Sequence, residues 1–215
     1  MSETSQLRAR FSRVLAALSK TERPEAVREE LLDRCVRWAT RVLEWNQRID
    51  LTAARSHDEL VDLLIADAVV VAELAGDAHD RWVDVGSGAG GPALGLALML
   101  PGASFTLVEP KAKRVAFLRG VVGELGCEHV KVQRARSQEL PNASFDSAIS
   151  RATFAPSEWL DEGARLAERA VWVLLAQTDA PPASEFEPVI DRRYMWPLTG
   201  VERRVVLYAR KVPAG

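Results

Sequence analysis

A glycine-rich stretch is the part of this sequence whose residue types and spacing most directly predict ligand chemistry. It reads Asp-Val-Gly-Ser-Gly-Ala-Gly-Gly over residues 84–91 and lies between a β-like run and helical spacing that begins near Pro92. Glycines permit a tight turn and let a ligand press against bare backbone, while a helix N-terminus offers free N–H groups. We therefore predict a ligand-binding loop. Its candidate contact residues are Asp84, Gly86, Ser87, Gly88, Ala89 and Gly90.

Two carboxylates indicate which ligand this loop binds. Gly86, Gly88 and Gly91 satisfy the G-x-G-x-x-G pattern of dinucleotide-binding proteins, so an NAD-dependent dehydrogenase is one interpretation. Glu109, at the end of the next expected strand, can accept both hydroxyl protons of a ribose and would repel the phosphate of an NADP ribose. Asp84 lies beside the loop, where its charge disfavours a pyrophosphate and suits a cationic ligand.

S-adenosylmethionine is a ligand of this kind, because it carries a sulfonium, an ammonium and an adenosine but no phosphate. We therefore predict S-adenosylmethionine as the cofactor. A methyltransferase is favoured over a dehydrogenase and over a purely structural glycine loop without a ligand. Pro110, which follows Glu109, and Arg136 and Ser137, which follow the third expected strand, complete the predicted cofactor contacts.

Metal chemistry is not expected. Cys35 and Cys127 are too few and too far apart for a zinc site or a disulfide framework, and His57, His79 and His129 are isolated. The two cysteines favour a reducing compartment, and no apolar run approaches the roughly 20 residues of a membrane span or resembles a signal peptide. We therefore expect a soluble, cytoplasmic protein that does not contact a membrane.

The elements that position these residues form two regions. Beyond Gly76, β-like runs alternate with helical spacing over residues 92–100, 111–125 and 156–167, which predicts a parallel sheet with crossover helices. The last two runs flank Thr199 and Gly200 and predict an antiparallel hairpin. This pattern favours an α/β fold, the Rossmann-like class I methyltransferase sheet with an antiparallel last strand. We assign residues 76–215 to this domain.

Residues 1–75 show only helical spacing, in three apolar stripes, and Ser56 with Glu59 has the pattern of a capping box that opens the third helix. We predict an N-terminal helical extension packed on the core of the second domain. The 215 residues, 47% hydrophobic and 27% charged, are enough for one such globular unit and exclude fibrous and disordered classes.

Four segments together resemble the RsmG family, also called GidB. Residues 45–53 resemble the family's W-N-x-x-I-N-L-T segment, residues 83–90 its cofactor loop, and residues 150–152 its S-R-A. Glu109 with Lys113, Arg114, Phe117 and Leu118 resembles its E-x-x-x-K-[KR]-x-x-F-L stretch. The resemblance implies a methyltransferase that modifies guanine N7 of 16S ribosomal RNA and acts on that RNA or on the small ribosomal subunit. We expect a monomer.

The substrate side departs from the family pattern. Residues 64–68 keep only Asp67 of H-x-x-D-S, Gly91-Pro92-Ala93 stands where the family has F-P-G, and residues 175–178 lack the lysine of K-G. Two alternatives therefore remain open. One is a methyltransferase that acts on a small molecule or protein, and the other is a homologue that binds S-adenosylmethionine without turnover.

Arg151 is the candidate catalytic residue. Guanine N7 has an unprotonated lone pair, so its methylation needs positioning in a dry pocket rather than a general base. Arg151 follows the fourth expected strand, at the edge of the sheet where such folds bind ligands, and could orient the acceptor through the guanine edge or a phosphate. The alternative is a structural salt bridge that closes the strand.

Although the formal net charge is −2, one part of the chain has an excess of basic residues. This excess indicates either a surface that binds RNA phosphates or a solvated helix face. Over residues 111–136 only Glu124 and Glu128 oppose it. Its members are Lys111, Lys113, Arg114, Arg119, Lys131, Arg134 and Arg136, and a second basic group near the end of the chain contains Arg192, Arg193, Arg203, Arg204, Arg210 and Lys211. Trp45, Phe154 and Trp159 could stack a splayed base or belong to the core.

Overall fold

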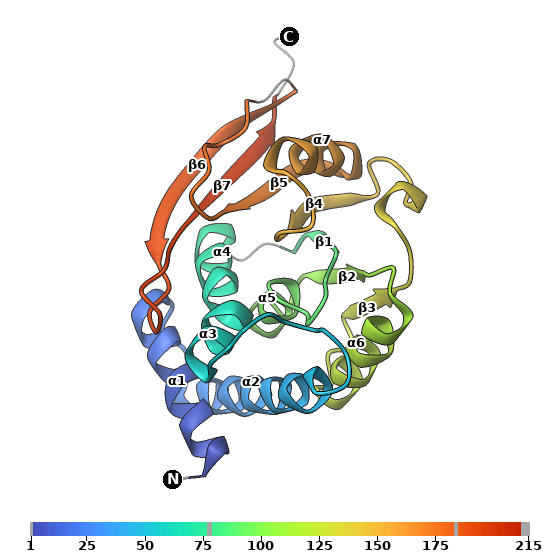
Figure 1. Ribbon diagram of the computed structural model, residues 1–215. Coiled ribbons are helices and arrows are strands. Elements are labelled where there is room, and N and C mark those ends of the chain that lie inside the picture. Colours follow the sequence, from blue (N-terminus) through green and yellow to red (C-terminus); the bar gives the residue numbers. More distant parts are fainter. Residues whose placement is uncertain (1, 77–78, 183–184, 212–215) are drawn as a thin grey trace.

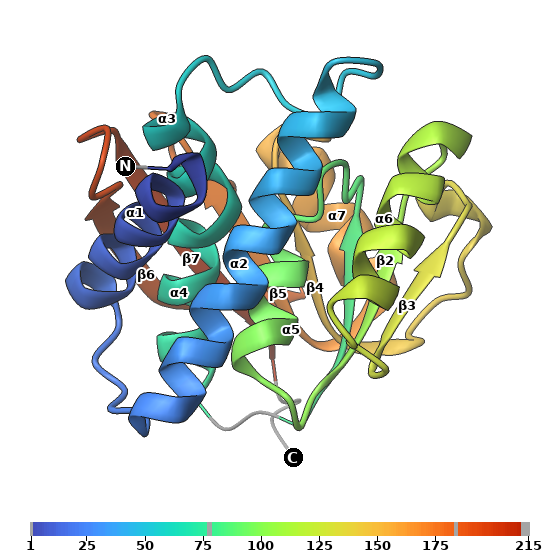
Figure 2. The same cartoon turned by 90° about the horizontal axis from the view of Figure 1, so that it is seen from below.

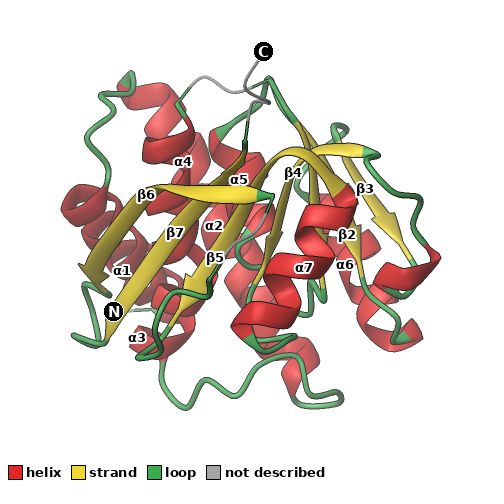
Figure 3. Ribbon diagram, turned by 90° about the horizontal axis from the view of Figure 1, so that it is seen from above, coloured by secondary structure: helices red, strands yellow, loops and turns green. Residues whose placement is uncertain are grey.

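A sheet of seven strands lies at the centre of the molecule (Figures 1 and 3). The computed structural model describes residues 2–76, 79–182 and 185–211. The strands are β1 (Arg81–Val85), β2 (Ser104–Val108), β3 (Val130–Gln133), β4 (Phe145–Ser150), β5 (Ala167–Leu175), β6 (Phe186–Met195) and β7 (Glu202–Arg210). Their spatial order is β3-β2-β1-β4-β5-β7-β6.

The strand directions place four strand ends at one edge. Strands β3, β2, β1, β4 and β5 run parallel, so Val85, Val108, Gln133 and Ser150 end at the same edge of the sheet. Strand β7 pairs antiparallel with both β5 and β6. This arrangement confirms the predicted α/β fold, a mostly parallel doubly wound sheet with an antiparallel hairpin at its end.

Helices cover both faces of the sheet. They are α1 (Glu3–Leu18), α2 (Glu25–Asn46), α3 (His57–Val61), the π-helix η1 (Asp62–Ala66), α4 (Asp67–Ala75), α5 (Ala93–Met99), α6 (Ala112–Glu124), the 3-10 turn η2 (Ser137–Glu139) and α7 (Pro156–Leu166). Helix α7 lies on one face, and α4, α5 and α6 lie on the other (Figures 1 and 3). Helices α1 and α2 form an outer layer over α4 and α5 (Figure 2).

Two hydrophobic cores result, one on each face of the sheet. The larger core contains Phe11 of α1, Trp38 of α2 and Trp172 of β5, and the smaller one contains Trp159 of α7 and Val83 of β1. Residues before Gly76 therefore share a core with the sheet. The division into an extension over residues 1–75 and a domain over residues 76–215 stays a prediction.

The helix boundaries agree with local sequence signals. Ser56 Oγ accepts the backbone N–H of Glu59 at 3.1 Å, which is one half of the predicted capping box. The Glu59 side chain accepts the backbone N–H of Arg55 at 2.8 Å and not that of Ser56, so the reciprocal bond of the box is replaced. The third apolar stripe, by contrast, is one helical path interrupted by the π-helix, a feature that the spacing did not predict. Within the described ranges, no helix combines the length and the apolar character that crossing a membrane requires.

We predict that neither part of the chain folds into a stable, soluble domain when it is expressed alone. Expressed separately, residues 1–75 and 76–215 each expose the apolar faces that meet in the larger core. Circular dichroism should show no cooperative thermal transition for the first fragment, and the second should aggregate or lose ligand binding. Two soluble fragments with sharp transitions would contradict the assigned architecture.

Candidate functional site

The glycine loop follows β1 and is held against the end of β2. The backbone N–H of Gly86 donates to Val108 O at 2.8 Å, and that of Gly90 donates to Ser87 O at 2.6 Å. Gly86 has φ 79°, and a Cβ there would lie 2.2 Å from Thr153 Oγ1. A side chain at this position would clash as well as strain the backbone, so glycine is required.

Asp84 is a buried carboxylate at the start of this loop. Its side chain is 2% exposed, and its Oδ2 has no hydrogen-bond partner among the described residues. Burial raises the pKa of Asp84 to about 7, opposed by a hydrogen bond from Ser87 and by the charge of Arg151, while the Glu109 charge raises it further. A cation placed beside Oδ2 would relieve this cost.

Glu109 is the second carboxylate of the site and also has 2% exposure. Its Oε2 accepts the backbone N–H of Gly88 at 3.2 Å, and its Oε1 accepts that of Lys111 at 2.9 Å. Arg114 Nη1 lies 3.9 Å from Oε2. The carboxylate therefore joins the glycine loop to the segment after β2, and each oxygen keeps a lone pair for a further donor.

The other predicted cofactor residues lie along the same edge. Ser87 is buried and donates its Oγ–H to Asp84 O, and Ala89 O accepts the indole N–H of Trp38 at 2.9 Å. The remaining residues differ in accessibility. Pro110 and Arg136 are exposed, Gly90 and Ser137 are buried, and Gly86 and Gly88 are half-buried. Trp38 was not predicted from the sequence, because its partner in the loop lies 51 residues away.

Arg151 follows β4, and its side chain donates three hydrogen bonds to other described residues. Its Nη1 donates to Leu63 O at 2.6 Å and to Asp67 Oδ2 at 3.0 Å, and its Nη2 donates to Gly91 O at 3.2 Å. The side chain is 18% exposed. A guanidinium has five N–H donors, so the Nε–H and one Nη2–H remain. The salt bridge considered from the sequence is present, and the partner of Arg151 is Asp67, the first residue of α4.

The segment after Arg151 folds over the glycine loop. Ala152 has φ 56°, an uncommon conformation for a residue with a side chain, and Thr153 Oγ1 donates to Val85 O at 3.2 Å. Phe154 is half-buried and stacks on Trp159 with ring centroids 6.0 Å apart. Trp159 is buried and donates its indole N–H to Trp172 O, so it belongs to the core.

The two basic groups differ in how many of their members form ion pairs among the described residues. Lys111, Lys113 and Arg136 are exposed near the carboxyl edge of the sheet and have no ion-pair partner among the described residues. In the second group, Arg204 pairs with Asp191 at 2.5 Å, Arg193 pairs with Glu202 at 3.0 Å and Arg210 pairs with Glu185 at 3.1 Å. The first group therefore keeps more charge for an external anion.

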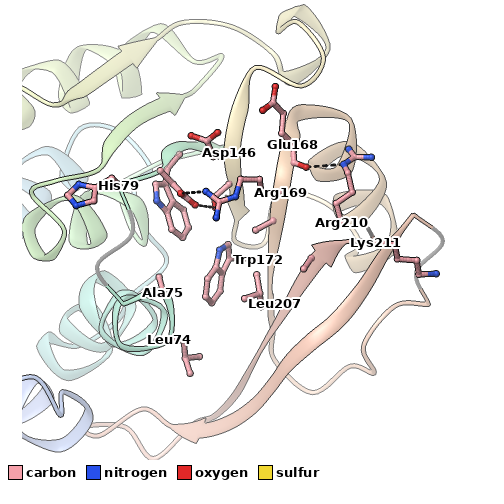
Figure 4. A pocket seen from close by; sticks show the side chains of 15 residues that line it. Leu74, Ala75, His79, Asp146, Glu168, Arg169, Trp172, Leu207, Arg210 and Lys211 are labelled. Carbon is pink, nitrogen blue, oxygen red and sulfur yellow. Dashed lines mark hydrogen bonds and ion pairs between the residues drawn. The ribbon is translucent and has the colours of Figure 1, made fainter. Parts of the chain in front are cut away.

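A cavity of about 1000 Å³ opens at the opposite edge of the sheet (Figure 4). Asp80 precedes β1, Asp146 is the second residue of β4 and Arg169 is near the start of β5, so these residues mark the amino ends of the strands. Arg169 pairs with Asp80 at 2.9 Å, and Arg81 pairs with Asp146. Because ligands of such folds bind at the carboxyl ends, this cavity is separate from the candidate site.

Comparison with known proteins identifies relatives over most of the chain. The family model described as rRNA small subunit methyltransferase G (GidB) matches residues 32–179. The Myxococcus xanthus protein named ribosomal RNA small subunit methyltransferase G is 32% identical over 199 residues, 86% of this chain and 91% of the relative. A Sodalis glossinidius protein of the same name is 40% identical over 111 residues, and this chain spans only about half its length, 52%.

Solved structures show the same fold at low sequence identity. TrmN from Thermus thermophilus aligns with a TM-score of 0.54 and 21% identity, covering 89% of this chain and 55% of that one. A SAM-dependent methyltransferase from Aquifex aeolicus aligns with a TM-score of 0.52 and 19% identity, covering 70% of this chain and 92% of that one. These likenesses establish the class I Rossmann-like fold.

We predict that Asp84→Asn changes the pH dependence of stability. Burial raises the Asp84 pKa from 3.8 to about 7, so between these values the folded protein binds more protons than the unfolded chain and stability falls as pH rises. An amide does not titrate. Relative to wild type, the variant should therefore gain up to about 4 kcal/mol in unfolding free energy between about pH 4 and pH 8, at about 1.4 kcal/mol per pKa unit.

Urea unfolding over this pH range measures the difference. Asp146→Asn is the control of opposite sign, because a hydrogen bond from Arg81 lowers the Asp146 pKa. That carboxylate stabilises the fold above its unfolded pKa, and the contribution disappears as pH falls through its folded pKa. A difference between wild type and Asp84→Asn that is independent of pH would contradict the prediction.

Proposed function

Because this chain belongs to the rRNA small subunit methyltransferase G (GidB) family, we propose that it transfers a methyl group from S-adenosylmethionine to guanine N7 of 16S ribosomal RNA. The observation that carries the cofactor assignment is the pair of buried carboxylates around the glycine loop. Asp84 offers an oxygen without a partner, and Glu109 offers lone pairs beside Gly88.

The residues present fit S-adenosylmethionine better than a dinucleotide. The unpartnered Asp84 Oδ2 suits the cationic methionine end of the cofactor, and the buried Glu109 suits the ribose hydroxyls. Two buried carboxylates oppose a pyrophosphate in the same place. The loop residues from Gly86 to Gly90, with Pro110, Arg136 and Ser137 along the edge, would complete the contacts.

The reaction needs orientation more than proton transfer. Bound S-adenosylmethionine supplies an electrophilic methyl group on its sulfonium. Guanine presents O6 and N7 as acceptors on one edge, and N7 must stay free to attack. The Nε–H and the spare Nη2–H of Arg151 can donate to O6 or to a phosphate, which leaves N7 unhindered. Arg151 would thus hold the acceptor in line without acting as a base.

The exposed basic residues Lys111, Lys113 and Arg136 support an RNA substrate. Lys111 and Lys113 are exposed at the start of α6, and Arg136 is exposed after β3, all near the carboxyl edge. Phosphates of 16S RNA, either naked or within the small ribosomal subunit, would be attracted to them. We expect the chain to act as a cytoplasmic monomer.

Mapping methylated nucleosides in 16S RNA tests this function. The protein and S-adenosylmethionine are incubated with naked 16S RNA and, separately, with 30S particles, and the nucleosides are identified by mass spectrometry. We expect 7-methylguanosine at one position in at least one substrate. Its absence from both would favour a small-molecule or protein acceptor, or binding without turnover, as the missing histidine and lysine of the family pattern permit.

We predict that Glu109→Ala weakens binding of S-adenosylhomocysteine by about 1.5–3 kcal/mol, because it removes hydrogen bonds to a charged group. Calorimetry measures the change. Glu109→Gln keeps one acceptor oxygen and should weaken binding less, and NAD should give no heat with any of the three proteins. Unchanged affinity in Glu109→Ala would place the ribose elsewhere.

We predict that Arg151→Ala spares cofactor affinity and lowers single-turnover methylation of 16S RNA by about 10²-fold or more, the cost of a misplaced reacting group. Arg151→Lys should rescue poorly, because an ammonium lacks the planar fork that reaches Leu63 O, Asp67 and Gly91 O. Arg169→Ala, which breaks an exposed ion pair at the opposite edge, is the matched control. Wild-type rates in Arg151→Ala would remove Arg151 from the site.

A further inference from the structure

Asp67 is a buried carboxylate that joins three segments far apart in the sequence. The residue is 1% exposed, and it is the first residue of α4. Oδ1 accepts the Tyr194 hydroxyl and the Trp196 indole N–H, both at 2.7 Å, and Oδ2 accepts Arg151 Nη1 at 3.0 Å. Tyr194 lies near the end of β6 and Trp196 directly follows that strand. The cluster of Asp67, Tyr194 and Trp196 thus connects the C-terminal hairpin to Arg151.

The chemistry of this cluster fixes its geometry. A buried charge is tolerated only when donors surround it, and hydrogen bonds to a charged acceptor are among the strong ones in proteins. Burial and the Asp67 charge raise the pKa of Tyr194 above its usual value, so the phenol stays protonated and donates. With two donors on Oδ1, Asp67 presents Oδ2 to Arg151 in one defined direction.

The opposite side of Arg151 is equally constrained. Leu63 O, which accepts from Nη1, belongs to the π-helix η1, a type of element that often marks functional positions. A Cβ at Gly91 would lie 3.1 Å from Leu63 O and 3.2 Å from Arg151 Nη2. The Arg151 guanidinium therefore lies between the π-helix and the end of the glycine loop and is hydrogen-bonded to both.

A second buried carboxylate attaches the tip of the hairpin to the same helix. Asp62 Oδ2 accepts the backbone N–H groups of Leu198 at 3.1 Å and Thr199 at 2.9 Å, and the Thr199 hydroxyl at 2.9 Å. Figure 1 shows the β6–β7 tip beside α1 and α3. Asp62 thus holds the turn, and Asp67 holds the strand end that precedes it.

We propose that Asp67, Tyr194 and Trp196 are positioning residues that set the orientation of Arg151, so that the β6–β7 hairpin controls how the acceptor is held at the methyl-transfer site. This inference rests on the proposed function. The hairpin would act through Arg151 and not through the cofactor, because none of the three side chains has a hydrogen bond to the loop residues Gly86 to Gly90 in the described structure.

Tyr194→Phe tests this role, and Tyr208→Phe is its matched control. Both tyrosines are buried in the hairpin and donate one hydroxyl, Tyr194 to Asp67 at 2.7 Å and Tyr208 to Pro181 O at 2.6 Å. Each full-length protein is measured for S-adenosylhomocysteine affinity and single-turnover methylation at saturating 16S RNA. Amide hydrogen exchange of residues 150–155 is followed with S-adenosylhomocysteine bound.

We expect Tyr194→Phe to slow methyl transfer by about tenfold or more and to speed exchange of residues 150–155 by a similar factor, the loss of one hydrogen bond to a charged acceptor. Its S-adenosylhomocysteine affinity should stay within about twofold of wild type, and Tyr208→Phe should match wild type throughout. Should Tyr194→Phe fail to fold, Trp196→Phe replaces it, and Tyr208→Phe remains the control.

Two results would overturn the inference. One is a Tyr194→Phe protein that equals wild type in both rate and exchange, and the other is a parallel fall of rate and cofactor affinity, which would mean general loosening of the site. If wild-type protein methylates no RNA, the proposed function fails, and the exchange of residues 150–155 alone decides whether the cluster positions Arg151.

Discussion

Burying a carboxylate without compensation costs several kcal/mol, and this constraint organises the site. The buried acidic side chains in the described part of the chain are Asp62, Asp67, Asp84 and Glu109. All four lie at the glycine loop or in the helical segment that packs on it. Asp62, Asp67 and Glu109 are satisfied by protein donors, and Asp84 alone keeps an oxygen without one. Because the fold leaves Asp84 Oδ2 without a donor among the described residues, a cationic ligand gains the most binding free energy beside this oxygen.

Features that depend on neighbours in sequence could be predicted from the sequence. The glycine loop, the alternation of strands and helices and the Ser56 helix cap each need only a few adjacent residues, and parallel strands then bring Glu109 beside the loop. Contacts between distant residues could not be predicted in this way. Asp67 and Tyr194 are 127 residues apart, and only the folded sheet places the end of β6 against α4.

The π-helix shows a further limit of sequence patterns. The apolar spacing of residues 60–74 fits an ordinary helix, and nothing local marks the wider turn at η1. The structure links this turn to close packing, because Cβ atoms at Gly91 and Gly95 would lie 3.1 Å from Leu63 O and 2.8 Å from Ala68 Cβ. The π-helix thus packs against two glycines, and Arg151 donates to the Leu63 carbonyl at the same place.

The two interpretations of Arg151 considered from the sequence are compatible in the structure. Its bonds to Leu63, Asp67 and Gly91 use three of five N–H donors, so the guanidinium can both close the site and keep donors for an acceptor. Its charge also favours the ionised form of Asp84, while that of Glu109 opposes it. One arginine therefore neutralises Asp67 by direct contact and biases Asp84 at longer range. Burial and the Ser87 hydrogen bond act more strongly on Asp84 than this charge does, so the main role of Arg151 stays on the acceptor side of the site.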